Sequence, residues 1–199
     1  ISSGLSKWCG AGGWRLGTFS FPVKLHWLMD AMAAVASETY TSVSAPIQYA
    51  AIQAFLCGSE IENYLSHVRK ILALLGKETA AILKNGNISV NDPTGGFYLF
   101  LDFTPLSEKL VKRGITDGSI LCDRLLDECG VAILPGVDFN RPAEELSARL
   151  SYVDFDGAKA LSASYSIPLH EKFPADFLLQ YCGNVIEAAE KIVEWGNAE

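Results

Sequence analysis

A long amphipathic segment, residues 59–85, constrains the fold of this chain more than any other feature. Apolar residues recur in it at helical spacing, namely Ile61, Leu65, Val68, Leu72, Leu75 and Ile82. Ser59-x-x-Glu62 forms a capping-box pattern at its start, and Asn85-Gly86 is a stop signal at its end. At a rise of about 1.5 Å per residue such a helix reaches about 40 Å, long enough to pass from one domain into another. We therefore expect a domain boundary at this helix.

The segments on either side of the helix differ in character. Before it, large and small residues alternate over 14–23 and the pattern stops at a proline, which predicts a strand. Residues 24–37 are apolar and Ala-rich, which predicts a helix. Pro46 suits the first turn of a second helix that ends near Cys57. After residue 86 strands and helices alternate, which predicts a sheet covered by helices on one face. The expected elements are strands at 88–90, 96–103, 131–134 and 148–153, a helix capped by Thr116 that ends at Gly130, a short helix capped by Asp154, and a helix over 177–195.

Composition excludes several classes of protein. The chain has 199 residues, 49% hydrophobic and 20% charged, with a net charge of −7, so it is neither disordered nor a small disulfide scaffold. It has no run of Lys or Arg, which argues against a nucleic acid or an anionic membrane as partner. No leader pattern opens it, and its five cysteines form no C-x-x-C pair. We therefore expect a cytoplasmic protein with reduced thiols.

The opening segment, SGLSKWCGAGGWRLG, holds the most unusual combination of residues. A lysine in apolar surroundings close to another cation loses basicity, and a neutral amine attacks carbonyl groups, as Lys7 could. Arg15 offers a planar fork that suits a phosphate, and the glycines between them allow backbone to approach an anion. An amine for an aldehyde and a guanidinium for a phosphate together describe pyridoxal 5′-phosphate (PLP). The alternative is two surface cations beside a Gly-rich turn; a nucleotide phosphate loop is disfavoured, because there the lysine follows the glycines.

The same segment closely resembles the cofactor-lysine segment of the class I/II, fold type I PLP-dependent aminotransferases. Four later stretches follow in the family's order, namely SAPIQYAA at 44–51, PTGGFYLFLDF at 93–103, GVAILPG at 130–136 and ARLSYV at 148–153. The resemblance implies an α/β fold, the C-terminal part of the fold type I transferase fold. Residues 1–58 are then the last part of the large PLP-binding domain, 59–85 the interdomain helix, and 86–199 the small α+β domain.

The resemblance also implies roles for individual residues. Lys7 matches the lysine that forms a Schiff base with PLP and then moves a proton, and Arg15 matches the phosphate-binding arginine. Arg149 matches the arginine that pairs with the substrate α-carboxylate, and we expect it at the end of a strand with its guanidinium unpaired until substrate arrives. Its alternative is a surface arginine at a strand edge.

Further residues fall at positions where the family has functional groups. Phe97 and Tyr98 match residues that line the substrate cleft, although core packing is an equal alternative. Thr41 and Ser42 match a loop that reaches a neighbouring subunit's cofactor. Cys9 lies close to Lys7, which makes it the thiol expected to react first with electrophiles, although packing is its default role.

The chain departs from the family pattern in two respects. Many relatives have a phosphate-binding serine three residues before the lysine; here that position is Gly4, which leaves Ser3 or Ser6 as substitutes. The family's chains are also about twice as long. The part without a counterpart here holds the aspartate that pairs with the pyridine nitrogen and the glycine-rich phosphate loop. We therefore expect residues before Ile1 in the complete protein, and an inactive chain without them.

The sequence is compatible with two functions. The first is a PLP-dependent aminotransferase of aspartate-type or broad range, a homodimer that exchanges an amino group between an L-amino acid and a 2-oxo acid. The second is a non-catalytic fragment or paralogue that packs against a partner polypeptide. The three histidines complete no zinc pattern, so no metal is expected.

Overall fold

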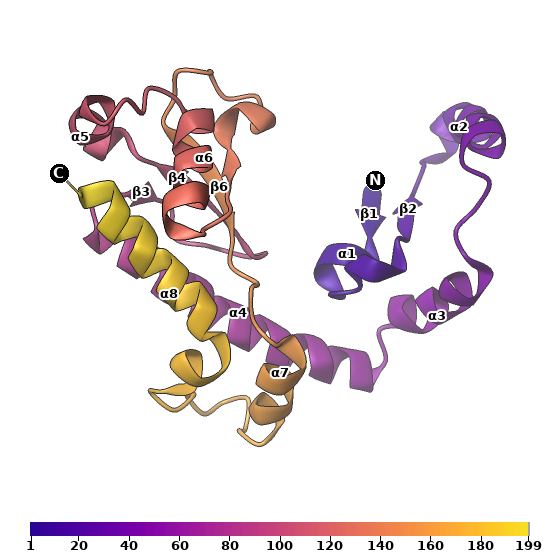
Figure 1. Ribbon diagram of the computed structural model, residues 1–199. Coiled ribbons are helices and arrows are strands. Elements are labelled where there is room, and N and C mark those ends of the chain that lie inside the picture. The colour runs from indigo at the N-terminus through magenta and orange to yellow at the C-terminus, as the bar shows by residue number, and fades with distance from the viewer. Residues whose placement is uncertain (199) are drawn as a thin grey trace. The chain divides into compact units, whose positions relative to one another are not determined.

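The computed structural model describes residues 1–198 and consists of two compact units (Figure 1). Unit 1 is Ile1–Ser66, and unit 2 begins at His67. Helix α4 (Ser59–Asn85) has the expected bounds and contains the boundary between the units. The three-part division into 1–58, 59–85 and 86–199 stays a prediction.

Unit 1 consists of a two-stranded sheet and three helices before α4. Its elements are β1 (Ser2–Gly4), α1 (Leu5–Trp8), a 3₁₀ turn (Gly12–Trp14), β2 (Gly17–Phe19), a second 3₁₀ turn (Val23–Leu25), α2 (His26–Thr39) and α3 (Ala45–Leu56). The two strands pair antiparallel, with Ser3 opposite Thr18. The expected strand over 14–23 is wrong in its bounds, because the first turn occupies its start and Arg15 adopts a left-handed conformation with φ of 51°.

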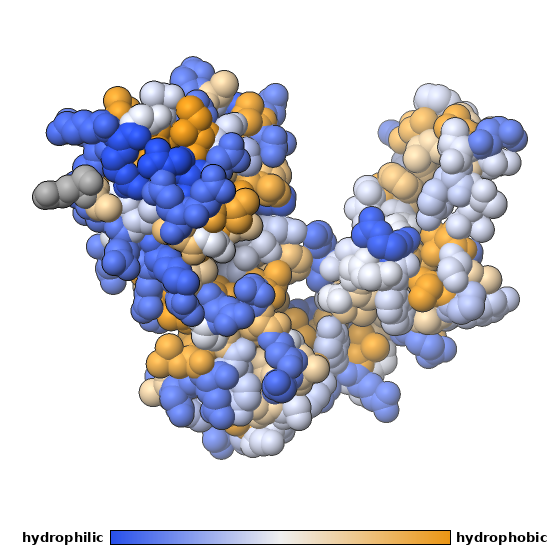
Figure 2. Space-filling model, viewed as in Figure 1, coloured by the Kyte–Doolittle hydropathy of each residue, from blue (hydrophilic) through white to orange (hydrophobic). Residues whose placement is uncertain are grey.

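The hydrophobic core of unit 1 contains few of the apolar residues of this unit. Four buried side chains form it, namely Leu5, Leu16, Ala51 and Ala54. Helix α2 has no buried residue, and Trp27 on it is 65% exposed. Figure 2 shows apolar side chains (orange) at the surface of this unit. Unit 1 therefore leaves much apolar surface in contact with solvent. Exposed apolar surface of this kind is typical of a surface that binds another polypeptide.

Unit 2 is built around a four-stranded antiparallel sheet in the order β3-β4-β6-β5. Its strands are β3 (Ser89–Val90), β4 (Tyr98–Asp102), β5 (Leu134–Pro135) and β6 (Ser147–Ser151). Its helices after α4 are α5 (Ser107–Lys112), α6 (Gly118–Cys129), α7 (Gly157–Tyr165) and α8 (Phe177–Asn197), with 3₁₀ turns at Thr104–Leu106 and Gly136–Phe139. No helix in the described residues is long and apolar enough to cross a membrane.

Only one face of this sheet is buried. Leu99, Leu101, Ala148 and Leu150 point to the covered face, where they join a single core with apolar residues of α4, α6 and α8. Because side chains alternate along a strand, Phe100 and Arg149 lie on the opposite face. The expectation of a sheet covered by helices on one face is confirmed.

Several expected element boundaries are wrong, each for a local reason. Asp117 rather than Thr116 caps α6, because its carboxylate accepts hydrogen bonds from the backbone N–H groups of Ser119 and Ile120, both at 2.9 Å. In the same way Asp156 rather than Asp154 caps α7. Thr and Asp are both good N-cap residues, and the cap is the one whose own backbone is extended at the helix start. The sequence alone does not distinguish it from a Thr or Asp one or two residues earlier.

The strand expected at 131–134 begins only at Leu134. Gly130 is left-handed, with φ of 68°, and the N–H of Val131 still bonds to the carbonyl of Leu125 in α6, so the chain is leaving the helix there. Helix α5 was not expected at all, because its six residues are too few for a clear period.

The end of α4 packs closely against α8. Gly86 has no room for a side chain, since a Cβ there would overlap both γ-carbons of Val193. The Asn197 side chain donates a hydrogen bond to the Gly86 carbonyl at 2.8 Å, which joins the same two helix ends. The left-handed residue after the helix is Asn87, with φ of 61°, so Gly86 serves close packing and not the turn.

We predict that Gly86→Ala lowers the free energy of unfolding by about 1–3 kcal/mol, because the added methyl group overpacks the contact with Val193. Chemical denaturation of the purified chain measures this. Gly95→Ala is the matched control, because a Cβ at Gly95 meets nothing within 4 Å. Equal stability of the two variants would contradict the packing described here.

Candidate functional site

Lys7 lies on a short loop that closes on itself. The backbone N–H of Leu5 donates to the carbonyl of Leu16 at 3.3 Å, and both leucine side chains are buried in the core of unit 1. Between these two anchors the chain makes the single turn of α1 and the turn Gly12–Trp14. Lys7 is exposed on this loop, so the residues of unit 1 do not bury its ammonium. The described residues therefore do not bury Lys7 in the apolar surroundings that were expected for it.

Arg15 lies at the other end of the same loop and is also exposed. Its left-handed backbone lets the guanidinium turn back and donate to the carbonyl of Gly12 at 3.3 Å. Gly10 has φ of +64°, and a Cβ there would lie 2.8 Å from the Tyr64 hydroxyl, which donates to the carbonyl of Cys9 at 3.0 Å. Gly10 is thus required both by its backbone angle and by the closeness of Tyr64.

The loop fits PLP by the chemistry of its groups. It carries one primary amine at Lys7, one guanidinium at Arg15 and one half-buried hydroxyl at Ser6. Gly12 and Gly13 have nothing within 4 Å of a Cβ position, so the backbone between the two cations is accessible to an anion. An aldehyde and a phosphate on one molecule match the amine and the guanidinium.

Cys9 is a weaker nucleophile than expected. Burial, and then the nearby Cys57 thiol, raise the pKa of Cys9 above its ordinary value, so less of it is thiolate near neutral pH. Cys57 is the exposed cysteine of the unit.

The loop between α2 and α3 contains Thr41 and Ser42. Thr41 is left-handed, with φ of 74°. Ser42 lines a mostly apolar cavity of about 640 Å³, together with Leu16, Ile52 and Phe55. Neither Lys7 nor Arg15 lines this cavity, and the expected role of the loop at a neighbouring subunit stays a prediction.

In unit 2, Arg149 occupies the middle of β6. The expectation that it lies at the end of a strand is therefore wrong. Arg149 stands opposite Phe100 of β4 and Leu134 of β5, so its strand is flanked on both sides. The alternative, a surface arginine at a strand edge, is therefore wrong, because β6 is not an edge strand. Among the described residues it takes part in no ion pair.

Two aromatic rings contact the Arg149 guanidinium. Its central carbon is 4.4 Å from the centre of the Tyr98 ring and 4.2 Å from that of Phe139. Phe97 packs against the core and contacts Tyr98, with ring centres 4.6 Å apart. Of the two residues expected at the cleft, Tyr98 is thus on the face of Arg149 and Phe97 takes the alternative, core packing.

Phe139 was missed from the sequence. It reaches Arg149 because the turn Gly136–Phe139 folds back over β6 after β5 ends. The available signal was Asn140, a residue type that tolerates the left-handed conformation which it adopts here (φ of 62°), directly after a Pro-Gly turn.

A second arginine on this side of unit 2 is already neutralised. Arg141 donates two hydrogen bonds to Glu145, both at 2.8 Å, and the pair lines a cavity of about 360 Å³ with Phe100 and Ser147. A bidentate pair of this kind leaves Arg141 little capacity for another carboxylate. Arg149 is the arginine of this face whose N–H groups are not committed to a carboxylate in the described structure.

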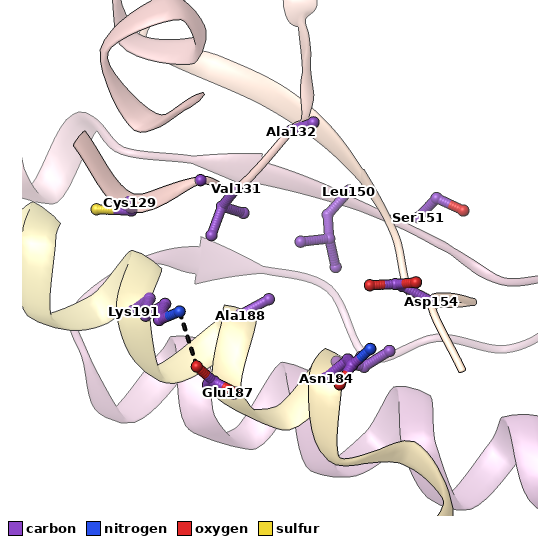
Figure 3. Close-up of a pocket in the computed structure, with 12 residues that line it drawn as sticks. Cys129, Val131, Ala132, Leu150, Ser151, Asp154, Asn184, Glu187, Ala188 and Lys191 are labelled. Carbon is purple, nitrogen blue, oxygen red and sulfur yellow. Dashed lines mark ion pairs between the residues drawn. The ribbon is translucent and has the colours of Figure 1, made fainter. Parts of the chain in front are cut away.

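Another cavity, of about 410 Å³, lies between the covered side of the sheet and α8 (Figure 3). Leu150 points into it from β6 and Val131 from the segment between α6 and β5, and Asn184, Ala188 and Lys191 line it from the helix. Lys191 is paired there with Glu187 at 2.7 Å, and this pairing raises the pKa of Lys191 and lowers that of Glu187. None of the site residues expected from the sequence lines this cavity.

Comparison with known proteins gives this arrangement a context. The model of the family "Aminotransferase class I and II" matches residues 1–159. An asparagine–oxo-acid transaminase of Streptococcus mutans is 28% identical over 157 residues, which are 76% of this chain and 36% of that protein. An aspartate/prephenate aminotransferase of Thermus thermophilus is 30% identical over 155 residues, or 75% of this chain and 35% of that protein. The chain thus spans little more than a third of the length of these relatives.

Solved structures of aminotransferases resemble this chain over nearly its whole length, which corresponds to about 40% of theirs. An aromatic aminotransferase from Pyrococcus horikoshii superimposes with a TM-score of 0.69 at 22% identity, over 98% of this chain and 41% of that one. An aspartate aminotransferase from Thermotoga maritima does so with a TM-score of 0.58 at 21% identity, over 99% and 40%. The fold is therefore the expected α/β fold, part of the fold type I aminotransferase fold. Since the family model covers most of the sequence, the chain belongs to the class I and II aminotransferases.

Proposed function

We propose that the complete protein is a PLP-dependent aminotransferase, which exchanges an amino group between an L-amino acid and a 2-oxo acid. The observation that carries this proposal is a closed loop on which Lys7 and Arg15 are both exposed, in a chain of this family. The relatives named as asparagine or aspartate transaminases favour an aspartate-type or broad-range substrate.

In this proposal the loop holds PLP. Arg15 binds the phosphate, and Ser6 is a further hydroxyl donor beside it. When bound, PLP supplies an electron-poor ring that takes up electrons as the substrate Cα loses its proton. Lys7 is an exposed residue of this loop, as a group that has to meet both cofactor and substrate requires.

Lys7 is the proposed proton carrier. A primary amine accepts a proton from Cα and returns one on the other side of the reacting system, which is general acid–base catalysis.

Arg149 is the proposed ligand of the substrate α-carboxylate. Its planar fork can donate two parallel hydrogen bonds to one carboxylate, and it makes no ion pair with any described residue. Amino acids and 2-oxo acids share a carboxylate beside the carbon that carries the amino or oxo group. In this proposal Arg149 binds the carboxylate and Lys7 acts at the neighbouring carbon.

We further propose that the complete protein is a cytoplasmic homodimer and that these 199 residues are inactive by themselves. The apolar surface of unit 1 supports association, and five cysteines without a disulfide support a reducing compartment. The exposed α2 supports equally the second candidate, a non-catalytic chain that packs against another polypeptide. Catalysis that depends on Lys7 separates the two.

We predict that Lys7→Ala lowers transamination by the complete enzyme at least about a hundredfold, because it removes the proton carrier. Steady-state kinetics with an amino acid and a 2-oxo acid measure the loss. Lys24→Ala, which removes another exposed lysine of unit 1, is the matched control and is expected to retain full activity. Undiminished turnover by Lys7→Ala would refute the assignment.

We predict that Arg149→Lys raises the Michaelis constants for amino acid and 2-oxo acid alike, by about tenfold to a hundredfold, because an ammonium cannot reproduce the planar fork. Affinity for PLP is expected to stay the same. Arg124→Lys is the control, since Arg124 pairs with Glu128 elsewhere in unit 2. Michaelis constants equal to those of the parent for both substrates would remove Arg149 from the site.

A further inference from the structure

The Arg149 guanidinium is held by aromatic rings rather than by a counter-charge. Tyr98 comes from the neighbouring strand β4, and Phe139 from the 3₁₀ turn that follows β5. Both ring centres lie within 4.4 Å of the guanidinium carbon, inside the range of a cation–π contact. All three side chains are half-buried, so the contacts are shielded in part from water.

The backbone fixes where the Phe139 ring lies. Gly136, at the start of the turn, packs directly on β6, and a Cβ there would overlap the Ser147 hydroxyl. The N–H of Arg141 then bonds to the carbonyl of Gly136 at 3.2 Å, which closes the turn. Phe100 meets the Phe139 ring at a nearly perpendicular angle of 87°, so the ring is also supported from β4.

Aromatic contacts act on an arginine differently from a carboxylate. A ring attracts the flat face of the guanidinium, whereas a carboxylate binds its N–H edge. A ring can therefore restrict the rotamers of a long side chain without occupying its hydrogen-bond donors. Arginine loses considerable rotamer entropy when it is fixed, and contacts made before the ligand arrives reduce the part that the ligand has to offset.

We propose that Phe139, together with Tyr98, is a positioning residue, which holds the Arg149 guanidinium by its face so that its edge receives a planar carboxylate. The inference deepens the proposed function and rests on it, since the carboxylate is that of the amino acid or oxo acid. Phe139 itself needs no contact with the substrate.

The test is a titration of the full chain, labelled with ¹⁵N-arginine, with pyruvate, followed by NMR. The chain has six arginines, and Arg149→Lys identifies the Nε–H signal of Arg149 by its loss. Pyruvate is expected to shift this signal with saturation, and its uncharged methyl ester is not. Phe139→Leu is expected to raise the dissociation constant for pyruvate about three- to tenfold, in line with the loss of one cation–π contact.

Two further variants separate positioning from general packing. Phe139→Tyr keeps the ring face and is expected to bind pyruvate within about twofold of the parent. Phe173→Leu removes a ring that contacts Lys70 elsewhere in unit 2, and it is expected to leave the titration unchanged. Should Phe139→Leu not fold, Tyr98→Leu removes the other ring and has the same expected effect.

The outcomes are distinct. If the parent responds to pyruvate and both Phe139→Leu and Tyr98→Leu bind it equally well, positioning by the rings is refuted while the role of Arg149 stands. Phe139→Tyr binding as weakly as Phe139→Leu also refutes it, because the ring face is then not the cause. If the Arg149 signal of the parent ignores pyruvate, the proposed carboxylate role fails, and this inference fails with it.

Discussion

The burial of one face of a four-stranded sheet is the constraint on which the rest of unit 2 depends. Leu99 and Leu101 of β4 alternate with Tyr98 and Phe100, so covering the first pair with helices leaves the second pair on the open side. The antiparallel register then places Arg149 opposite Phe100. A charged side chain in the central part of a sheet is tolerated there because its face is not part of the core.

Unit 1 is held together in a different way. Its hydrophobic core has four buried members, and the lysine loop depends on the closure between Leu5 and Leu16 and on the hydrogen bond from Tyr64. Apolar burial is the main source of stability in a folded domain, at about 25 cal/mol per Å². The exposed apolar residues of α2 and α3 therefore represent stabilisation that unit 1 gains only against another surface.

Features with a long sequence period could be predicted, and features set by a few atoms could not. The apolar repeat of α4 and the position of Pro46 at the start of α3 were sufficient to locate both helices. The caps of α6 and α7 were misplaced by one and two residues, since several adjacent side chains can accept the same hydrogen bonds. Phe139 was missed, because its contact with Arg149 depends on the turn that follows β5, which only Asn140 signals, and not on any pattern near Arg149.

If the loop around Lys7 binds PLP, as we propose, chemical trapping reveals it. The purified protein is incubated with PLP, reduced with borohydride and digested, and the modified lysines are located by mass spectrometry. Of the ten lysines in the chain, we expect Lys7 to be modified, and we expect excess inorganic phosphate and Arg15→Ala each to suppress that modification. Modification spread over the other exposed lysines, with Lys7 unlabelled or unaffected by phosphate, would contradict it.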